Sequence, residues 1–157
     1  MHVLALLAAC SGVGWHLHAG ELWSEATGQH TATIAVANAG PACTLDGYPR
    51  IVLLDARRRP LAFRYTHRGD QMITEARPQP VRVAHGGTVY FAFNKYRCDI
   101  GSLATARFVR VLLPGSRRWL ELRMSRYPII DYCREAISLR VAVSPIVATT
   151  AALSRHR

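Results

Sequence analysis

Apolar and polar residues alternate along most of the chain, and helical periodicity is nearly absent. Residues 31–37, 88–93 and 137–144 show the pattern most clearly, because an apolar side chain occupies every second position. Successive side chains of a β-strand point to opposite faces, so this period of two predicts strands with one buried face. Turn residues separate the predicted strands, which are 15–18, 31–37, 50–55, 61–65, 81–83, 88–93, 106–113, 119–124 and 137–144. The sequence therefore predicts an all-β fold, an antiparallel β-sandwich of about eight or nine short strands, with a barrel as the alternative.

The heptad Cys43–Pro49 ends one of these segments and opens the next. It holds a cysteine, a glycine, an aromatic ring and a proline, residue types that fix a turn or a corner. We interpret it as a structural corner between two sheets, without chemistry of its own.

A chain of 157 residues favours one domain with its own core. We expect the sandwich to span residues 10–147, with residues 66–80 as a long surface loop. Residues 148–157 follow a proline and end in basic residues, and they predict a frayed tail.

Residues 1–9 are almost wholly apolar but lack a positively charged leader. They are either part of an export signal or an extra N-terminal strand. The run Leu7–Gly12 resembles a lipobox, the site at which exported bacterial lipoproteins are lipidated on cysteine. Lipidation of Cys10 and a disulfide at Cys10 exclude each other.

The four cysteines are widely spaced and form no C-x-x-C pair, which disfavours a zinc ribbon or a thioredoxin-like site. An even number near predicted loops and strand ends fits two disulfides in an oxidising compartment. Four cysteines allow three pairings, and their spacing does not choose among them.

The net charge is +10, and nearly all of it is arginine, since Lys95 is the only lysine. One interpretation is a coding bias towards arginine and alanine; the other is attraction to a polyanion. The blocks Arg57–Arg59 and Arg117–Arg118 are predicted at turn tips rather than along a groove.

Several elements resemble an actinobacterial exported family, the domain-of-unknown-function family numbered forty-two thirty-two. The matching elements are Asn38–Gly40 with the heptad, Leu53–Ala56, Cys98, Tyr132–Cys133 and Val143–Ile146. The resemblance implies an immunoglobulin-like β-sandwich of secreted or lipoprotein type, with no established activity. It also implies disulfides between Cys10 and Cys43 and between Cys98 and Cys133, and so favours a bridged Cys10 over a lipidated one. The chain departs from the family where His85-Gly86-Gly87 replaces a Pro-Gly turn, and it shows no full export signal.

Catalytic and metal-binding patterns are weak. His16 and His18 would share one face of a strand, as metal ligands sometimes do, with a third ligand from His30, His67 or His85. We interpret them instead as exposed histidines on a solvent-facing strand.

Three further patterns would indicate an enzyme. No serine lies in a glycine elbow, and Gly86-Gly87 precedes neither a lysine nor a helix start, so it is a turn and not a phosphate loop. Asp46 and Asp131 would form a carboxylate pair only if two corners of the sheets met. We therefore expect no catalytic residue, no cofactor and no metal.

Nucleic-acid binding would use Arg107 and Arg110 near Phe108, and Arg123 and Arg126 near Tyr127, as phosphate and stacking contacts. No recognition helix, zinc knuckle or aromatic platform motif accompanies them, so no nucleic-acid partner is expected. The sequence favours a non-enzymatic secreted or cell-envelope binding module, extracellular or lipid-anchored. Its partner would be an anionic envelope polymer, lipid head groups or another envelope protein. The alternatives are a metal-dependent or hydrolytic enzyme on the same sandwich and a cytoplasmic nucleic-acid-binding protein.

Overall fold

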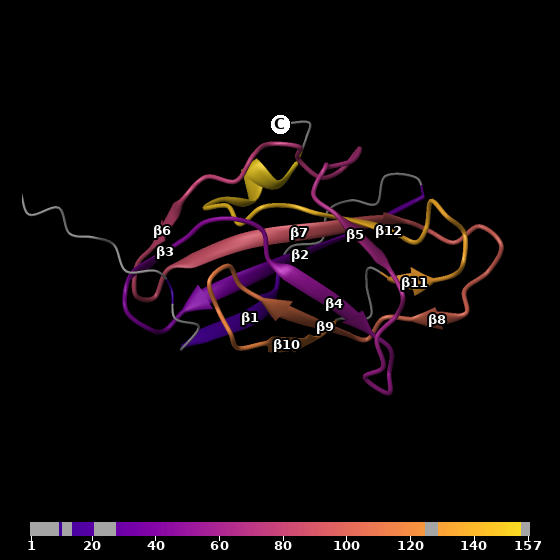
Figure 1. Ribbon diagram of the computed structural model, residues 1–157, viewed down its shortest axis with the longest axis horizontal. Coiled ribbons are helices and arrows are strands. Elements are labelled where there is room, and N and C mark those ends of the chain that lie inside the picture. Colours follow the sequence, from indigo (N-terminus) through magenta and orange to yellow (C-terminus); the bar gives the residue numbers. More distant parts are fainter. Residues whose placement is uncertain (1–9, 11–13, 21–27, 125–128, 155–157) are drawn as a thin grey trace, which may run out of the picture.

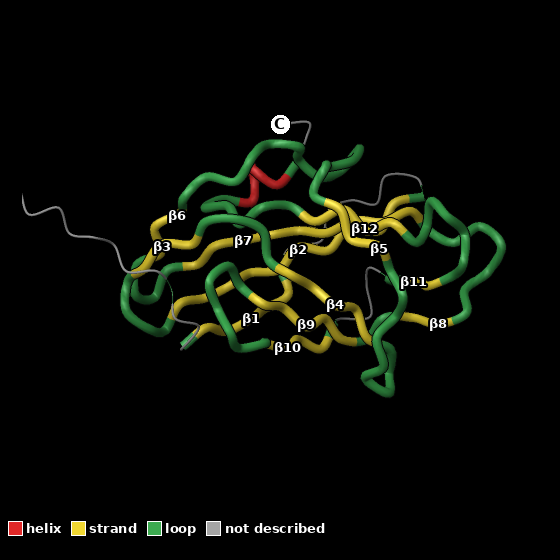
Figure 2. Tube along the Cα trace, viewed as in Figure 1, coloured by secondary structure: helices red, strands yellow, loops and turns green. Residues whose placement is uncertain are grey.

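The computed structural model describes Cys10 and residues 14–20, 28–124 and 129–154, which form an all-β protein (Figures 1 and 2). These ranges contain twelve strands, one 3-10 helix and no α-helix. The elements are β1 (Trp15–Ala19), β2 (Gln29–Asn38), β3 (Cys43–Leu45), β4 (Arg50–Leu54), β5 (Arg64–Thr66), β6 (Val81–Val83), β7 (Thr88–Tyr96), β8 (Ala104–Thr105), β9 (Phe108–Leu112), β10 (Leu120–Arg123), β11 (Asp131–Tyr132), β12 (Arg140–Val143) and η1 (Thr150–Leu153). The predicted all-β fold is confirmed. The residues 1–9 for which an export signal or an extra strand was expected lie outside the described ranges.

Two main sheets make up the body of the molecule. The larger has five strands in the order β1-β2-β7-β12-β5, and the smaller has three in the order β10-β9-β4. Neighbouring strands are antiparallel except β12 and β5, which run parallel. Two two-stranded sheets, β3-β6 and β11-β8, lie at opposite ends of the long axis (Figure 1). The two main sheets together hold eight strands, which is within the predicted eight or nine, whereas the short end strands β3, β8 and β11 and the parallel β12–β5 pair were not predicted.

The main core lies between the two larger sheets. Register places Ile34 of β2 opposite Phe91 of β7, and Leu53 of β4 opposite Val109 of β9. These four side chains belong to one contiguous apolar cluster and are at most 3% exposed. Alternation along each strand directs such residues inward and the polar ones outward. The two sheets thus pack face to face, as in a β-sandwich.

The predicted last strand, 137–144, begins later than its alternation indicated. Residues 136–139 form turns, in which the N–H of Leu139 donates to the Glu135 carbonyl. The Ser138 hydroxyl donates to the Arg97 carbonyl at 2.8 Å, and Ile137 is 55% exposed. Local hydrogen bonds therefore replace strand pairing over these residues, and only Arg140–Val143 joins the sheet.

The C-terminal segment covers the reverse face of the five-stranded sheet. Leu153 of η1 is fully buried and packs in a second apolar cluster with Ile73, Ala92 and Ala142. Its carbonyl accepts a hydrogen bond from the N–H of Thr74 at 2.9 Å. The predicted frayed tail is therefore wrong for residues 148–154, because Leu153 and Ile73 cover alanines that would otherwise expose a flat apolar patch. Residues 155–157 lie outside the described ranges.

Replacing Leu153 with alanine is expected to lower the free energy of unfolding by at least about 2 kcal/mol, because a filled apolar site is emptied. Urea unfolding measures this loss. The matched control, Ala148→Ser, changes an exposed residue of the same segment and is expected to stay within about 0.5 kcal/mol. A Leu153→Ala protein as stable as the control would contradict the docking of this segment.

Two disulfides brace opposite ends of the molecule. Cys10 is bonded to Cys43 of β3, with 5.1 Å between their Cα atoms. Cys98 is bonded to Cys133, directly after β11, with a Cα separation of 6.0 Å. These are the two pairs that the family resemblance implied. Because the Cys10 sulfur is bonded to Cys43, it is not available for the thioether of a lipid anchor in this structure.

Candidate functional site

Arginine and aromatic side chains gather on the outer face of the three-stranded sheet. Register places Arg50 opposite Leu112 and Arg110 opposite Val52, so both arginines leave the sheet on the side away from the core. Phe108 lies on the same face, two residues from Arg110 along β9, whereas Arg58 and Trp119 come from flanking loops. We call this set the arginine–aromatic face; it consists of Arg50, Arg58, Phe108, Arg110 and Trp119.

Trp119 lies within cation–π range of two guanidinium groups. The Cζ atom of Arg110 is 5.2 Å from the centroid of its ring, and that of Arg50 is 5.7 Å away. Such contacts contribute about 0.5–1 kcal/mol each at an exposed site and hold the guanidinium planes in place. In the part of the chain that the structure describes, no carboxylate lies within ion-pair distance of either arginine. Neither guanidinium group therefore has a direct ion-pair partner among the described residues, although Glu121, which pairs with Arg58, is opposite Arg110 in the strand register.

Arg58 extends the face at the other end of β9. Its Cζ lies 4.3 Å from the centroid of the Phe108 ring, and its Nε donates to Glu121 Oε1 at 2.8 Å. Because the Arg58 side chain is 61% exposed, this ion pair is screened by water and contributes at most about 1 kcal/mol. Arg58 is therefore positioned by contacts and has a direct ion-pair partner, whereas Arg50 and Arg110 have none among the described residues.

The turn that carries Arg58 is organised by Asp55. One carboxylate oxygen of Asp55 accepts the N–H groups of Arg57 and Arg59, at 2.8 and 2.9 Å. The hydrogen bond from the Arg59 N–H, together with the Arg59 guanidinium and the Arg57 N–H, outweighs desolvation and lowers the pKa of Asp55. The turn places Arg58 in the left-handed region, with φ of 56°. The predicted turn tip at Arg57–Arg59 is present, but Arg58 folds back over Phe108.

A hollow of about 270 Å³ adjoins Trp119 and Arg50, and Tyr65 and His67 line its other side. The ring of Tyr48 stacks on His67 with 3.9 Å between the centroids. Burial lowers the pKa of His67, which favours the neutral ring. The hollow is thus bounded by rings and by one unneutralised guanidinium, the chemistry that suits a small anionic or hydroxylated group.

Tyr65 fixes one wall of this hollow. Its hydroxyl oxygen accepts the N–H of Leu53 at 2.9 Å, and burial raises its pKa to about 12. We expect one of the six tyrosines to titrate near pH 12, in a step that Tyr65→Phe removes, as followed by ultraviolet absorbance. A raised folded-state pKa means that the protonated hydroxyl stabilises the fold. This stabilisation is complete below about pH 10 and is lost as the pH rises towards 12.

Tyr65→Phe also leaves the Leu53 N–H without its acceptor, which is expected to lower the free energy of unfolding by about 1–3 kcal/mol. A titration curve of the unsubstituted protein that shows no step near pH 12 would contradict the burial of Tyr65.

The two paired histidines and the three candidates for a third ligand lie on separate elements. His16 and His18 are both exposed on β1, whereas His30 lies on β2, His67 follows β5 and His85 lies in the turn before β7. Within the described ranges, no group of three close ligand atoms includes a histidine. The structure therefore does not bring these side chains together.

The predicted carboxylate pair is also separated. Asp46 directly follows β3 and Asp131 begins β11, and these two strands lie at opposite ends of the long axis (Figure 1). Asp131 instead pairs with Lys95.

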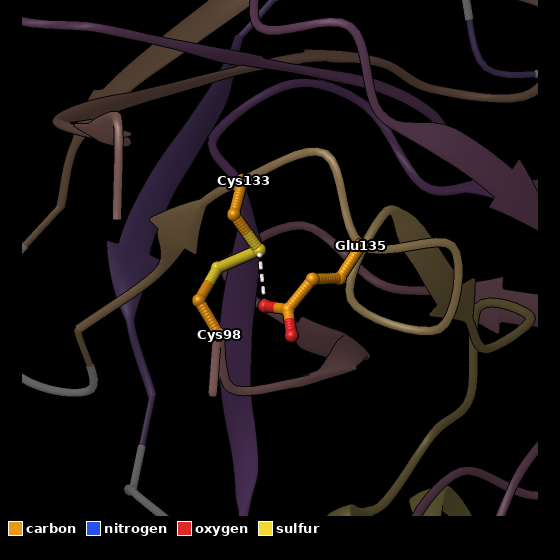
Figure 3. A group of neighbouring side chains, drawn as sticks. All are labelled: Cys98, Cys133 and Glu135. Atoms are coloured by element: carbon orange, nitrogen blue, oxygen red, sulfur yellow. Dashed lines mark hydrogen bonds between the residues drawn. A yellow bond between two sulfur atoms is a disulfide. The ribbon is translucent and has the colours of Figure 1, made fainter. Parts of the chain in front are cut away.

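Cys98, Cys133 and Glu135 form the one group in the described ranges whose ligand atoms are close enough to share a metal ion (Figure 3). Glu135 Oε2 lies 3.1 Å from Cys133 Sγ and accepts the Asp99 N–H at 2.9 Å. Thiolates are the metal-binding form of cysteine, and both sulfur atoms here are bonded to each other. The disulfide accounts for this group, and the contact with Glu135 is not a hydrogen bond because Sγ carries no hydrogen.

Lys95 and Asp131 form a pair that the sequence did not predict. The Lys95 side chain is 0% exposed, and its Nζ donates to Asp131 Oδ1. Burial lowers the pKa of Lys95, and the charges of Asp131 and Glu135 offset only part of this effect. Burial also opposes ionisation of Asp131, but the hydrogen bonds from Lys95 and from the Cys98 N–H outweigh it and lower the pKa of the carboxyl.

Of the residues named for nucleic-acid contact, Arg110 and Phe108 lie on one face of β9, but the closest cation–π partner of each is a different residue. Phe108 is contacted by Arg58, and Arg110 lies over Trp119. Arg126 and Tyr127 lie outside the described ranges. The sequence analysis did not identify Arg50 and Trp119 as partners of Arg110. The alternation of Arg50–Leu54 did carry part of this information, because it predicts that Arg50 points away from the side of the strand on which Ile51 and Leu53 are buried.

The fold and the two disulfides define an all-β, disulfide-bonded domain of the kind found in extracellular proteins. A family model, Domain of unknown function (DUF4232), matches residues 17–154, and the chain therefore belongs to that family. No curated protein and no solved structure matches the chain. Among the described residues there is no helix long and apolar enough to cross a membrane.

Proposed function

We propose that the protein is a non-enzymatic binding module of the cell envelope or the extracellular space, and that its arginine–aromatic face binds an anionic envelope polymer. The observation that supports the proposal is Trp119 beside two guanidinium groups that have no direct ion-pair partner among the described residues. Planar guanidinium groups make paired hydrogen bonds to phosphate and carboxylate oxygens, and a ring beside them contacts the apolar backbone of a polymer.

The charge of the whole chain supports the same partner class. A net charge of +10 attracts a polyanion at long range and raises the rate of encounter. The arginine–aromatic face then supplies short-range contacts to the bound polymer, which the net charge alone does not provide. Arg50 and Arg110 are held beside Trp119 on the three-stranded sheet. The two disulfides fit an oxidising compartment, in which envelope polymers are the accessible polyanions.

Binding to a poly(glycerol phosphate) chain, measured by calorimetry at physiological salt, tests the proposal. The double variant Arg50→Gln/Arg110→Gln is expected to bind at least tenfold more weakly, a loss of about 1.4 kcal/mol. The matched control, Arg77→Gln/Arg82→Gln, removes two exposed charges from a different part of the surface. It is expected to weaken binding by less than about threefold, through long-range charge alone.

Three outcomes would contradict the proposal. The first is equal weakening by the two double variants, which would show that only net charge matters. The second is equal affinity for the phosphate polymer and for neutral dextran. The third is tighter binding to double-stranded DNA of the same charge, with loss on Arg50→Gln/Arg110→Gln, which would favour a nucleic-acid partner.

A further inference from the structure

A lysine–aspartate pair is enclosed at the end of the sandwich that carries β8 and β11. Lys95, the only lysine of the chain, has a side chain that is 0% exposed, and its Nζ lies 2.5 Å from Asp131 Oδ1. Register places His30 of β2 opposite Lys95 of β7, and His30 Nε2 is 3.6 Å from the same carboxylate oxygen. The arrangement holds an amine, a carboxyl group and an imidazole together in a largely buried site.

The amine is close to the carbon atom of the carboxyl group. Because a carbonyl C–O bond measures about 1.2 Å, Lys95 Nζ lies no farther than about 3.7 Å from Asp131 Cγ. Reacting atoms in a near-attack geometry are about 3–3.5 Å apart. A shift of a few tenths of an ångström therefore brings the nitrogen to the distance from which it attacks.

The attack needs a neutral amine, and the burial of Lys95 favours that form. Phe63 is buried, its ring centroid lies 6.0 Å from Lys95 Nζ, and the ring packs edge-on against Tyr132. An apolar environment penalises an ammonium and a carboxylate separately. Transfer of one proton from Lys95 to Asp131 gives a neutral amine and a carboxylic acid, which avoid this penalty at the cost of weaker hydrogen bonds to the Asp131 oxygens.

Two further groups act on the oxygens of Asp131. The backbone N–H of Cys98 donates to Oδ2 at 2.8 Å, and it can stabilise negative charge that develops on this oxygen during attack. His30 is adjacent to Oδ1, on the side of the leaving oxygen, where an imidazole can pass a proton.

We propose that Lys95 and Asp131 condense spontaneously into an intramolecular isopeptide bond. After the proton transfer, Nζ attacks Cγ and the C–N bond forms while negative charge develops on Oδ2. His30 relays the second amine proton to Oδ1, the Cγ–Oδ1 bond breaks and water leaves. One ammonium and one carboxylate thus give one amide and one water, and no oxidant or further reactant is required.

The bond links the end of central strand β7 to β11, near the Cys98–Cys133 disulfide. It differs from the disulfide in one property that matters outside the cell, since an amide is not reversed by thiols. The end of the sandwich would therefore remain closed under reducing conditions that open Cys98–Cys133. The inference is independent of the polymer-binding proposal.

The intact mass of the full chain, measured after denaturation and complete reduction, tests the bond. Reduction restores the hydrogens lost in the disulfides, so only the loss of water remains, and the expected mass is about 18 Da below that calculated for the chain. Proteolysis of the reduced protein is expected to give a branched peptide that joins Lys95 to Asp131.

Lys95→Arg and Asp131→Ala are each expected to restore the full calculated mass, and the measurement does not require either variant to fold. Because the chain has one lysine, acetylation in denaturant gives a second readout: Lys95 of the unsubstituted protein is expected to resist the reagent. A reduced protein with its full calculated mass and an acetylated Lys95 would overturn the proposal and leave the pair as an ion pair.

Discussion

Replacing Phe91 with alanine is expected to lower the free energy of unfolding by about 3–5 kcal/mol. Phe91 lies on central strand β7, is 0% exposed and belongs to the core cluster between the two main sheets. Removing the ring loses its burial and leaves a cavity that strands held by hydrogen bonds on both sides cannot close. Urea unfolding followed by far-ultraviolet dichroism measures the loss.

Two control variants make the result specific. Phe91→Leu keeps much of the volume and is expected to cost less than Phe91→Ala. Thr88→Ala changes an exposed residue of the same strand and is expected to stay within about 0.5 kcal/mol. If Phe91→Ala and Thr88→Ala were equally stable, the core would not lie between these sheets.

Removing the disulfide at the β3 end, with Cys10→Ser/Cys43→Ser, is expected to cost about 3–4 kcal/mol. The bond joins residues 33 positions apart, and it lowers the entropy of the unfolded chain by closing that loop. Cys10 and Cys43 are also at most 7% exposed, so the variant places two hydroxyl groups in the core. Thermal unfolding of the oxidised protein and of the double variant measures the difference.

The second disulfide provides the comparison, because it joins residues 35 positions apart and would have nearly the same entropic effect by itself. If Lys95 and Asp131 are joined as proposed, almost the same loop is already closed. Cys98→Ser/Cys133→Ser is then expected to lose clearly less stability than Cys10→Ser/Cys43→Ser. An undiminished melting temperature for the Cys10→Ser/Cys43→Ser protein would contradict the bracing role of the first bond.

Alternation predicted the parts of the fold in which one face of a strand is buried. The segment 88–93 is one example, since Val89, Phe91 and Phe93 all enter the core from β7. Alternation gives the wrong structure where local hydrogen bonds favour a turn over a strand. Ile137 and Leu139 continue the alternation of β12, yet Ser138 and Glu135 hold this stretch in turns.

The C-terminal segment shows a second limit. A proline followed by small and basic residues predicts a loose end, and nothing local reveals that Leu153 covers Ala92 and Ala142. These alanines lie on strands more than ten residues away in sequence, so the burial is a property of the tertiary fold alone.

The candidate site was only partly readable from the sequence. The excess of arginine predicted an affinity for polyanions, but the partners of each arginine depend on strand register. Trp119 meets Arg50 and Arg110 only because β4 and β10 flank β9. The burial of Lys95 could have been predicted from the sequence, because Lys95 follows Phe91 and Phe93 at the same spacing of two and so points into the core from β7.

An NMR titration with poly(glycerol phosphate) tests most directly whether the arginine–aromatic face is the binding site. The chain has three tryptophans, and Trp119→Phe assigns the indole N–H of Trp119 by its loss. If the polymer binds at this face, the Trp119 signal and the guanidinium signals of Arg50 and Arg110 are expected to shift together, while those of Arg77 and Arg82 stay in place. An unmoved Trp119 signal, with shifts at Arg77 and Arg82, would contradict binding at this face.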